Sequence, residues 1–183
     1  AETLRSRISE QRRFIQVVAG PRQVGKSTMV KQVLADTATP HLFVTAEESE
    51  SNDPRWIHIV WAQARQTMIL NKATEFLLVI DEIHKITNWS EAVKAEWDTD
   101  TRENCNIKVI LLGSSRLLIK DGLTESLAGR FEIIEMTHWS LREMQDAFAF
   151  TPEQYIYFGG YPGGATLISN ERPWRKYIKE AII

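Results

Sequence analysis

A glycine-bounded loop at residues 20–28 limits what this chain can fold into more than any other stretch. Its sequence is GPRQVGKST, with an apolar run at residues 14–19 before it and a helix-like run at residues 29–35 after it. This order of strand, loop and helix is the context that a phosphate-binding loop requires. The alternative is a glycine-bounded turn before an ordinary amphipathic helix. The context favours a site for a nucleoside triphosphate.

The chemistry of such a loop assigns a role to most of its residues. Gly20 and Gly25 lack a Cβ, so the backbone can aim successive N–H groups at an anion. Lys26 is expected to reach the β- and γ-phosphates, and the Ser27 hydroxyl to bind Mg²⁺. The predicted nucleotide-binding residues are Gly20, Pro21, Arg22, Gln23, Val24, Gly25, Lys26, Ser27 and Thr28.

After a second strand-like run at residues 41–46, a third apolar run, at residues 76–80, ends in Asp81 and Glu82. A run that is apolar on both faces indicates a central strand in a sheet covered by helices on both sides. The carboxyl ends of such strands are where α/β sheets bind their ligands. We therefore expect Asp81 to organise Mg²⁺, directly or through a water, and Glu82 to orient the water that attacks the γ-phosphate. The alternative is that the two acids begin a loop or cap the next helix.

Another buried-type run, at residues 107–113, ends in Ser114 and Ser115. Two interpretations of these serines stay open and do not exclude each other. In one, a hydroxyl is hydrogen-bonded to the attacking water or to the γ-phosphate. In the other, the serines cap the helix that follows, a role that serine often fills.

Arg130 stands directly before the fifth strand-like run, at residues 132–137. A guanidinium suits bidentate recognition of phosphate, in its own subunit or in a neighbouring one. Spacing alone favours a surface ion pair with Glu125 or Glu132 instead.

The spacing between Lys26 and Asp81 leaves room for a helix, a whole strand and a second helix. This arrangement places an extra strand between the phosphate-loop strand and the acidic strand. Together with Glu82 it favours hydrolysis over phosphoryl transfer to a metabolite. A switch that binds the nucleotide and rarely turns it over is a second interpretation, and a small-molecule kinase is a third.

Length and composition set the remaining bounds. With 183 residues, the chain fits one domain with a small appendage, and its net charge of −2 gives no global attraction for nucleic acid or an anionic membrane. The single cysteine, Cys105, cannot form an internal disulfide, which favours a reducing compartment. Without an apolar run of about 18 residues or a signal-peptide profile, the expected location is the cytoplasm.

We expect two regions along the chain. Residues 1–139 read as a phosphate-loop ATPase core, and residues 140–183 as a small helical, lid-like region. The second region begins at a capping box on Ser140 and contains a glycine-rich break at residues 159–164, which we interpret as a turn between helices. The apolar residues at the end of the chain suggest that the natural protein continues into a further domain.

Five motifs, in this order, resemble those of the prokaryotic AAA+-type ATPases that carry a C-terminal domain of unknown function. They are residues 20–28, residues 77–85 followed by Asn88 and Trp89, residues 112–115, residues 126–131 and residues 159–162. The resemblance implies an α/β P-loop NTPase fold of three α/β/α layers. Its five-stranded parallel sheet would have the phosphate-loop strand between the fifth strand and the Ser114 strand, with the Asp81 strand beyond that.

The resemblance also implies a function and partners. It favours ATP over GTP, Mg²⁺-dependent hydrolysis and a homo-oligomer. Arg130 matches an arginine that, in relatives, can act across a subunit interface. Two departures limit the comparison. The chain ends where the C-terminal domain of the family should begin, so a protein or DNA partner bound there lies outside it. A second sensor arginine has no defining motif, although Arg172 and Arg175 are candidates.

Overall fold

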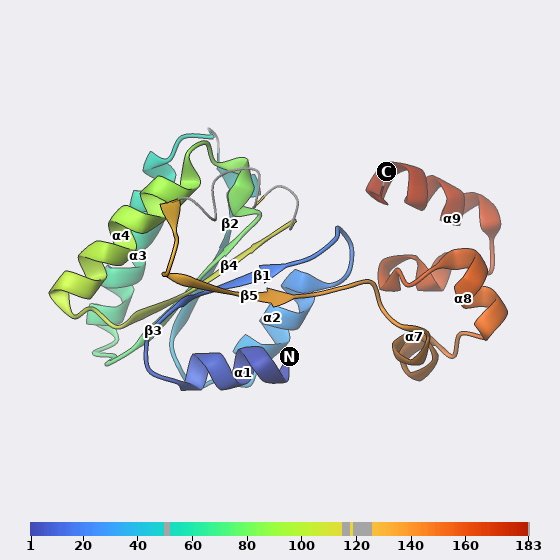
Figure 1. Ribbon diagram of the computed structural model, residues 1–183, viewed down its shortest axis with the longest axis horizontal. Coiled ribbons are helices and arrows are strands. Elements are labelled where there is room, and N and C mark those ends of the chain that lie inside the picture. Colours follow the sequence, from blue (N-terminus) through green and yellow to red (C-terminus); the bar gives the residue numbers. More distant parts are fainter. Residues whose placement is uncertain (50–51, 115–117, 119–125, 183) are drawn as a thin grey trace. The chain divides into compact units, whose positions relative to one another are not determined.

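The computed structural model describes residues 1–49, 52–114, 118 and 126–182, which include a five-stranded, all-parallel sheet (Figure 1). Its strands are β1 (Ile15–Ala19), β2 (His41–Thr45), β3 (Phe76–Asp81), β4 (Ile107–Gly113) and β5 (Phe131–Glu135). The strand order is β2-β3-β4-β1-β5. Strand β4 therefore separates the phosphate-loop strand from the acidic strand, which confirms the predicted order.

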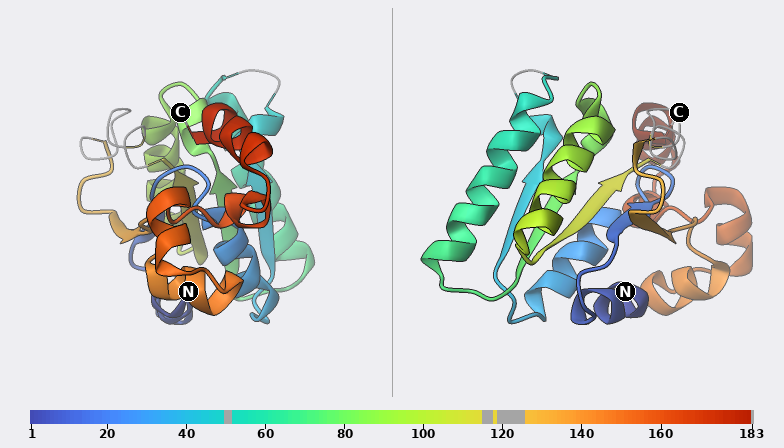
Figure 2. Two further views of the ribbon diagram at one scale, coloured as in Figure 1. Left: turned by 90° about the vertical axis from the view of Figure 1, so that its right-hand side faces the viewer. Right: turned by 60° about the vertical axis from the view of Figure 1, so that its left-hand side comes forward.

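Helices cover both faces of the sheet, as the apolar runs predicted. Helices α3 (Arg55–Leu70) and α4 (Trp89–Glu103) lie on one face, and α1 (Glu2–Ser9) and α2 (Lys26–Ala35) lie on the other (Figure 2). Two short 3₁₀ turns, η1 (Ala46–Glu48) and η2 (Ile83–Lys85), follow the carboxyl ends of β2 and β3. The result is the expected three-layer α/β/α architecture.

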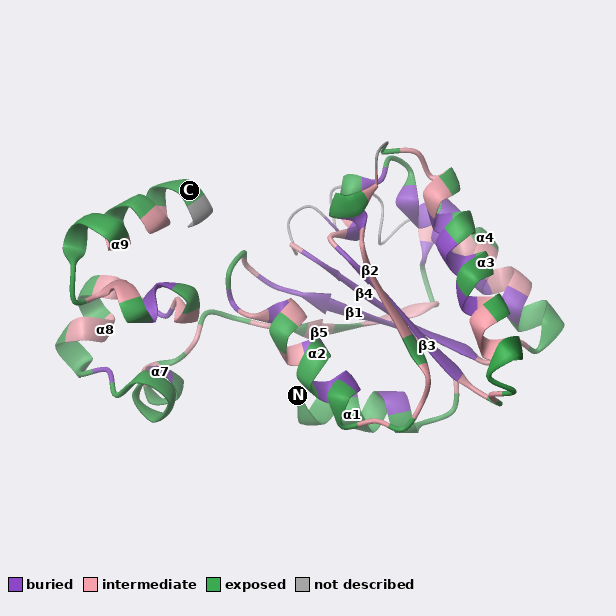
Figure 3. Ribbon diagram, turned by 180° about the vertical axis from the view of Figure 1, so that it is seen from behind, coloured by how far each residue is buried: buried purple, intermediate pink, exposed green. Residues whose placement is uncertain are grey.

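The main core lies between the sheet and helices α3 and α4. Alternate strand residues such as Leu78, Val109 and Val17 join it, together with the fully buried Trp61 and Trp89. Every residue of β1, β3 and β4 is buried, whereas β2 and β5 at the two edges are partly open (Figure 3). Burial on both faces explains why the three inner strands are mostly apolar, with Gln16 in β1 and Lys108 in β4 as buried polar exceptions.

The chain divides into two compact units. The sheet unit consists of Ala1–Ala19 and Ser27–Glu135, and the helical unit consists of Gly20–Lys26 and Met136–Ile183. Most of the phosphate loop thus groups with the C-terminal helices. None of the helices in the described ranges is long and apolar enough to span a bilayer.

The helical unit is built from short, well-capped elements. They are α7 (Leu141–Phe148), α8 (Pro152–Phe158), the 3₁₀ turn η3 (Pro162–Leu167), α9 (Glu171–Tyr177) and the π-helical turn η4 (Ile178–Ile182). Ser140 and Thr151 each begin a helix with a complete capping box. Met144, Phe150 and Ala165 form a small core of their own. Capping and this core hold helices that are too short to be stable alone.

Candidate functional site

The phosphate loop has the backbone of an anion-binding loop. Gln23 and Gly25 both lie at positive φ, at 62° and 89°, on either side of the buried Val24. Glycine reaches such dihedrals without steric cost, which explains Gly25. Gly20 is needed for another reason, because a Cβ there would lie 2.2 Å from the carbonyl oxygen of Met136.

Lys26 is only 7% exposed and lies at the first position of α2. Its ammonium donates to the carbonyl oxygens of Gly20 at 3.1 Å and Pro21 at 2.7 Å. The Lys26 side chain therefore folds back over the phosphate loop. Its ammonium lies beside the loop backbone that we expect to face the phosphates. The start of α2 adds the partial positive charge of a helix N-terminus. Around it, Arg22, Gln23 and Thr28 are exposed.

Ser27 and Asp81 meet within the sheet unit, although 54 residues separate them in the sequence. The Ser27 Oγ donates to the Asp81 Oδ2 at 2.5 Å, and Asp81 is 8% exposed at the carboxyl end of β3. A hydroxyl and a carboxylate suit Mg²⁺, which takes one or two protein oxygens and completes its shell with phosphates and waters. The donor chemistry of this pair fits the ion that the fold implies. No group of three or more metal-binding side chains occurs among the described residues.

Glu82 follows Asp81 in a left-handed conformation, with φ of 51°. Its amide donates to the Asp81 Oδ1 at 2.9 Å. A residue other than glycine rarely adopts this conformation, and such backbone strain is concentrated at functional sites. The two neighbouring carboxylates contact different partners, Asp81 with Ser27 and Glu82 with His84.

His84 contacts Glu82, a relationship that its spacing in the sequence did not predict. The His84 Nε2 lies 3.3 Å from the Glu82 Oε2, and the His84 side chain is 8% exposed. Its Nδ1 packs so closely on β4 that a Cβ at Gly113 would lie 3.1 Å from it. The imidazole therefore bridges the Glu82 carboxylate and the end of the neighbouring strand. The available signal was a histidine two residues after the second acid.

Of the two serines that follow β4, Ser114 lies within the described residues. Ser114 is half-buried at the carboxyl end of β4, and its carbonyl accepts a hydrogen bond from the Leu118 amide at 3.0 Å. Ser115 lies outside the described residues. Ser114 thus stands at the same edge of the sheet as Asp81 and Glu82, since all strands are parallel. Both interpretations of Ser114, as a sensor and as part of a helix start, stay predictions.

Arg130 lies at the amino ends of the strands, opposite the carboxyl ends where these residues lie. It precedes β5, whose first residue, Phe131, pairs with Ile15 at the start of β1. Its guanidinium forms two hydrogen bonds to the Asp98 carboxylate of α4, at 2.8 and 3.0 Å. Hydrogen bonding to Arg130 lowers the pKa of Asp98. The structure therefore brings Ser27, Asp81 and Glu82 together but leaves Arg130 apart from them.

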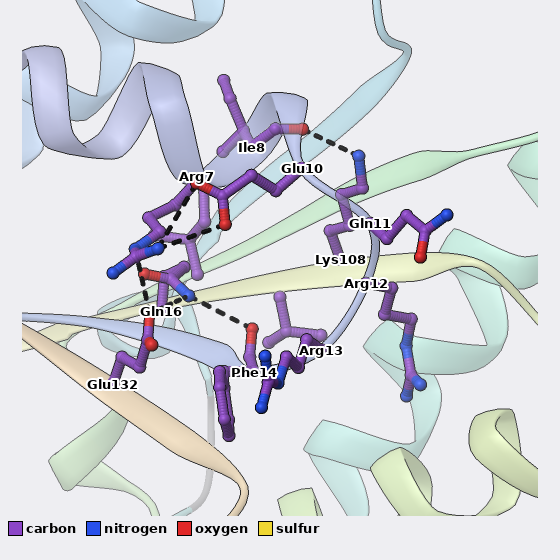
Figure 4. A pocket seen from close by; sticks show the side chains of 12 residues that line it. Arg7, Ile8, Glu10, Gln11, Arg12, Arg13, Phe14, Gln16, Lys108 and Glu132 are labelled. Carbon is purple, nitrogen blue, oxygen red and sulfur yellow. Dashed lines mark hydrogen bonds and ion pairs between the residues drawn. The ribbon is translucent and has the colours of Figure 1, made fainter.

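A small cavity of about 70 Å³ also opens at the amino ends of β1, β4 and β5 (Figure 4). Several of its charged side chains are already paired. Arg7 contacts both Glu10 and Glu132, and the buried Lys108 donates to the carbonyl of Ile8. The cavity lies away from Asp81, at the other edge of the sheet, and its ion pairs join α1 to the strands.

A parallel sheet with β4 between the phosphate-loop strand and the acidic strand, and a serine–aspartate pair at its carboxyl edge, defines a P-loop NTPase. A family model described as an AAA domain matches residues 12–145. The chain therefore belongs to the AAA domain family, a family of nucleotide-binding ATPases. None of the curated proteins searched matches the chain.

Proposed function

We propose that this protein binds ATP with Mg²⁺ and hydrolyses it to ADP and phosphate. The observation that carries the proposal is the Ser27–Asp81 hydrogen bond at 2.5 Å, with Glu82 as the next residue along the chain at φ 51°. A small-molecule kinase has no need of a carboxylate that activates water. Glu82 therefore favours water as the acceptor of the γ-phosphoryl group.

Each residue has a defined role in this proposal. The loop amides and Lys26 bind the β- and γ-phosphates, while Ser27 and Asp81 hold Mg²⁺, which neutralises phosphate charge when it is bound. Glu82 orients a water and accepts its proton as the oxygen bonds to the γ-phosphorus. The bond from the γ-phosphorus to the bridging oxygen of ADP breaks, and inorganic phosphate leaves. Ser114 and Ser115 are the candidates for sensing the γ-phosphate.

Arg130 is the remaining candidate catalytic residue, and its position supports action in trans. It precedes the amino end of β5, whereas Asp81 lies at the carboxyl end of β3. In a homo-oligomer, Arg130 of one subunit stabilises the transition state in its neighbour. We therefore expect the isolated subunit, with Arg130 bonded to Asp98, to turn ATP over slowly. The second candidate function is a nucleotide-gated switch that binds ATP, rarely turns it over, and relays its nucleotide state to a further domain or to a protein or DNA partner.

The test is ATP turnover by the parent and by Glu82→Gln, with Mg²⁺ and with EDTA. The parent should hydrolyse ATP only with Mg²⁺, and faster than GTP. Glu82→Gln should bind ATP as tightly as the parent but turn it over about 10²-fold more slowly, because the general base is lost. Glu48→Gln, an exposed glutamate in η1, is the matched control and should behave as the parent.

Three results would separate the alternatives. Tight ATP binding with negligible turnover at every protein concentration favours the switch. Transfer of the γ-phosphate to a small acceptor favours a kinase. A parent that binds neither ATP nor GTP, or a Glu82→Gln variant as fast as the parent, contradicts the proposed hydrolysis.

A further inference from the structure

Trp139 ties the phosphate loop to the C-terminal helices inside the helical unit. Its indole N–H donates to the carbonyl oxygen of Val24 at 3.0 Å. Val24 lies at the middle of the loop and is fully buried. The hydrogen bond spans 115 residues of sequence, from the loop to the residue before the N-cap of α7.

The loop needs such a donor because of its backbone geometry. Gln23 and Gly25 both have positive φ, and a turn of this kind aims consecutive N–H groups at an anion. A carbonyl on the outer side of the turn must then find a partner of its own when it is buried. The indole N–H is a donor with no acceptor function, so it can satisfy the carbonyl oxygen at this place.

Trp139 is itself fixed by the helical unit. Its amide donates to the Gly160 carbonyl at 3.1 Å, and its carbonyl accepts from the Tyr155 hydroxyl at 2.8 Å. A Cβ at Gly160 would lie 2.1 Å from the Trp139 carbonyl oxygen, so only glycine fits there. The Trp139 ring packs against the small core around Met144. Trp139 precedes the N-cap of α7 and Met144 is the fourth residue of that helix, so the contact is a hydrophobic staple.

We propose that Trp139 is a positioning residue for the phosphate loop and that it couples nucleotide binding to the folding of α7 and α8. The inference rests on the proposed function, since it assumes that the loop binds a nucleotide. Without the indole N–H, the loop populates its binding conformation less often, and the apparent affinity falls by that fraction. By linkage, a bound nucleotide stabilises the helices that hold Trp139.

The first test is Mg²⁺–ADP binding by calorimetry to the parent, Trp139→Phe and Trp174→Phe. Trp139→Phe keeps an aromatic ring but removes the N–H, and its Kd should rise about tenfold, as expected for the loss of one hydrogen bond to a buried carbonyl. Trp174→Phe is the matched control. Trp174 lies in the same unit but packs on Tyr157 and Phe158, so the variant should keep the Kd of the parent.

The second test is hydrogen exchange with and without Mg²⁺–ADP. Amides of α7 and α8 should exchange more slowly in the bound parent and in bound Trp174→Phe, but not in Trp139→Phe at a matched degree of saturation. A structural role alone would change exchange equally in the free and bound states. Tyr155→Phe, which removes the donor to the Trp139 carbonyl, should also raise the Kd for Mg²⁺–ADP. If Trp139→Phe does not fold, Tyr155→Phe tests the role of Trp139 in its place.

The outcomes distinguish this inference from the proposed function. A parent that binds no nucleotide contradicts both. A parent that binds Mg²⁺–ADP while Trp139→Phe and Tyr155→Phe bind it equally well overturns the role of Trp139 and leaves the nucleotide site in place.

Discussion

Arg130 and Asp98 form a two-point ion pair, with Nε 2.8 Å from Oδ1 and Nη2 3.0 Å from Oδ2. The side chains are 33% and 40% exposed, so the pair contributes less than about 1 kcal/mol to stability. Such a weak pair can give way to a stronger anion. Arg130 lies at the amino ends of the strands and Asp81 at their carboxyl ends, so about 15 Å of strand length separates the two positions.

We predict that Arg130→Ala subunits and Glu82→Gln subunits restore activity to each other. Each variant alone should lose turnover, Arg130→Ala by about 10³-fold or more. In a mixture, one subunit keeps the Glu82 site and its neighbour supplies Arg130, so ATP turnover should recover to a measurable fraction of that of the parent.

Titration of one variant into the other, followed by phosphate release, measures this recovery. Arg142→Ala, which removes an exposed arginine of α7, is the control for the loss of a surface charge. If mixtures stay as inactive as the separate variants while Arg130→Ala alone is inactive, Arg130 acts within its own subunit and the assignment to a neighbouring site is wrong.

The contact between His84 and Glu82 leads to a second prediction. The imidazole Nε2 lies 3.3 Å from the carboxylate, and the imidazole Nδ1 packs against the end of β4. His84→Ala should lower kcat about tenfold or more, because a misplaced general base loses much of its effect, while the ATP affinity stays that of the parent. His84→Gln, whose amide nitrogen can occupy the place of Nε2, should recover most of the lost kcat.

His58→Ala provides the comparison for this pair. His58 contacts Glu96 at 2.6 Å through Nδ1, on the outer side of α3 and α4, and its loss should not change kcat. If His84→Ala and His84→Gln are equally slow, the contact with the Glu82 carboxylate is not what His84 contributes. If His84→Ala weakens ATP binding instead of kcat, its role is in the nucleotide site as a whole.

Local pattern predicted the strands well, for a physical reason, whereas their order in the sheet followed from the family resemblance. Strands buried on both faces are mostly apolar, and a phosphate loop needs a strand before it and a helix after it. The Ser140 capping box, contained within four residues, could be read directly from the sequence and is present in full. Glu82 was a candidate from its place after a buried strand, although its left-handed backbone was not visible in the pattern.

Long-range partners could not be predicted in the same way. Sequence spacing offered Glu125 or Glu132 as the partner of Arg130, but the described partner is Asp98, on a helix 32 residues earlier. Glu132 instead contacts Arg7, at 3.0 Å. Side-chain pairing between elements depends on how the helices pack on the sheet, which no local pattern records. The hydrogen bond from Trp139 to the phosphate loop could not be predicted from the sequence for the same reason.

A buried hydrogen-bond network between α3 and α4 should contribute measurably to the stability of the sheet unit. Asp100 is fully buried and accepts hydrogen bonds from the Trp61 indole and the Arg65 guanidinium, both at 2.7 Å. Asp100→Ala should lower the free energy of unfolding by about 2–3 kcal/mol, because it leaves the buried indole N–H unpaired and Arg65 with Glu96 as its remaining carboxylate partner. Trp61→Phe, which keeps an aromatic ring but removes the indole N–H, should lower the free energy of unfolding by about 1–3 kcal/mol.

Urea denaturation followed by far-UV circular dichroism measures both changes. Asp98→Ala on the same helix is the matched control and should cost less than about 1 kcal/mol, since that ion pair is partly exposed. Equal losses for Asp100→Ala and Asp98→Ala would show that burial of the network contributes nothing beyond an ordinary surface pair.

The ion pair between Lys108 and Glu75 predicts a pH dependence of stability. The Lys108 ammonium, 10% exposed, donates to the Glu75 Oε2 at 2.7 Å and to the Ile8 carbonyl at 2.7 Å. The hydrogen bond from the Lys108 ammonium lowers the pKa of Glu75 below the usual value of 4.5. A carboxyl with a lowered pKa in the folded state stabilises the fold above its unfolded pKa. That contribution disappears as the pH falls from about 4.5 through the lowered pKa.

Glu75→Gln should therefore be less stable than the parent at neutral pH, by about 1 kcal/mol given that the Glu75 side chain is 37% exposed. The difference in unfolding free energy should shrink as the pH falls below about 4.5, because the parent loses the ionised carboxylate and the variant has none to lose. Urea denaturation between pH 7 and pH 3 measures the difference, with Glu103→Gln at the exposed end of α4 as the control. A difference that stays constant over this range would mean that the charge of Glu75 does not contribute to holding Lys108.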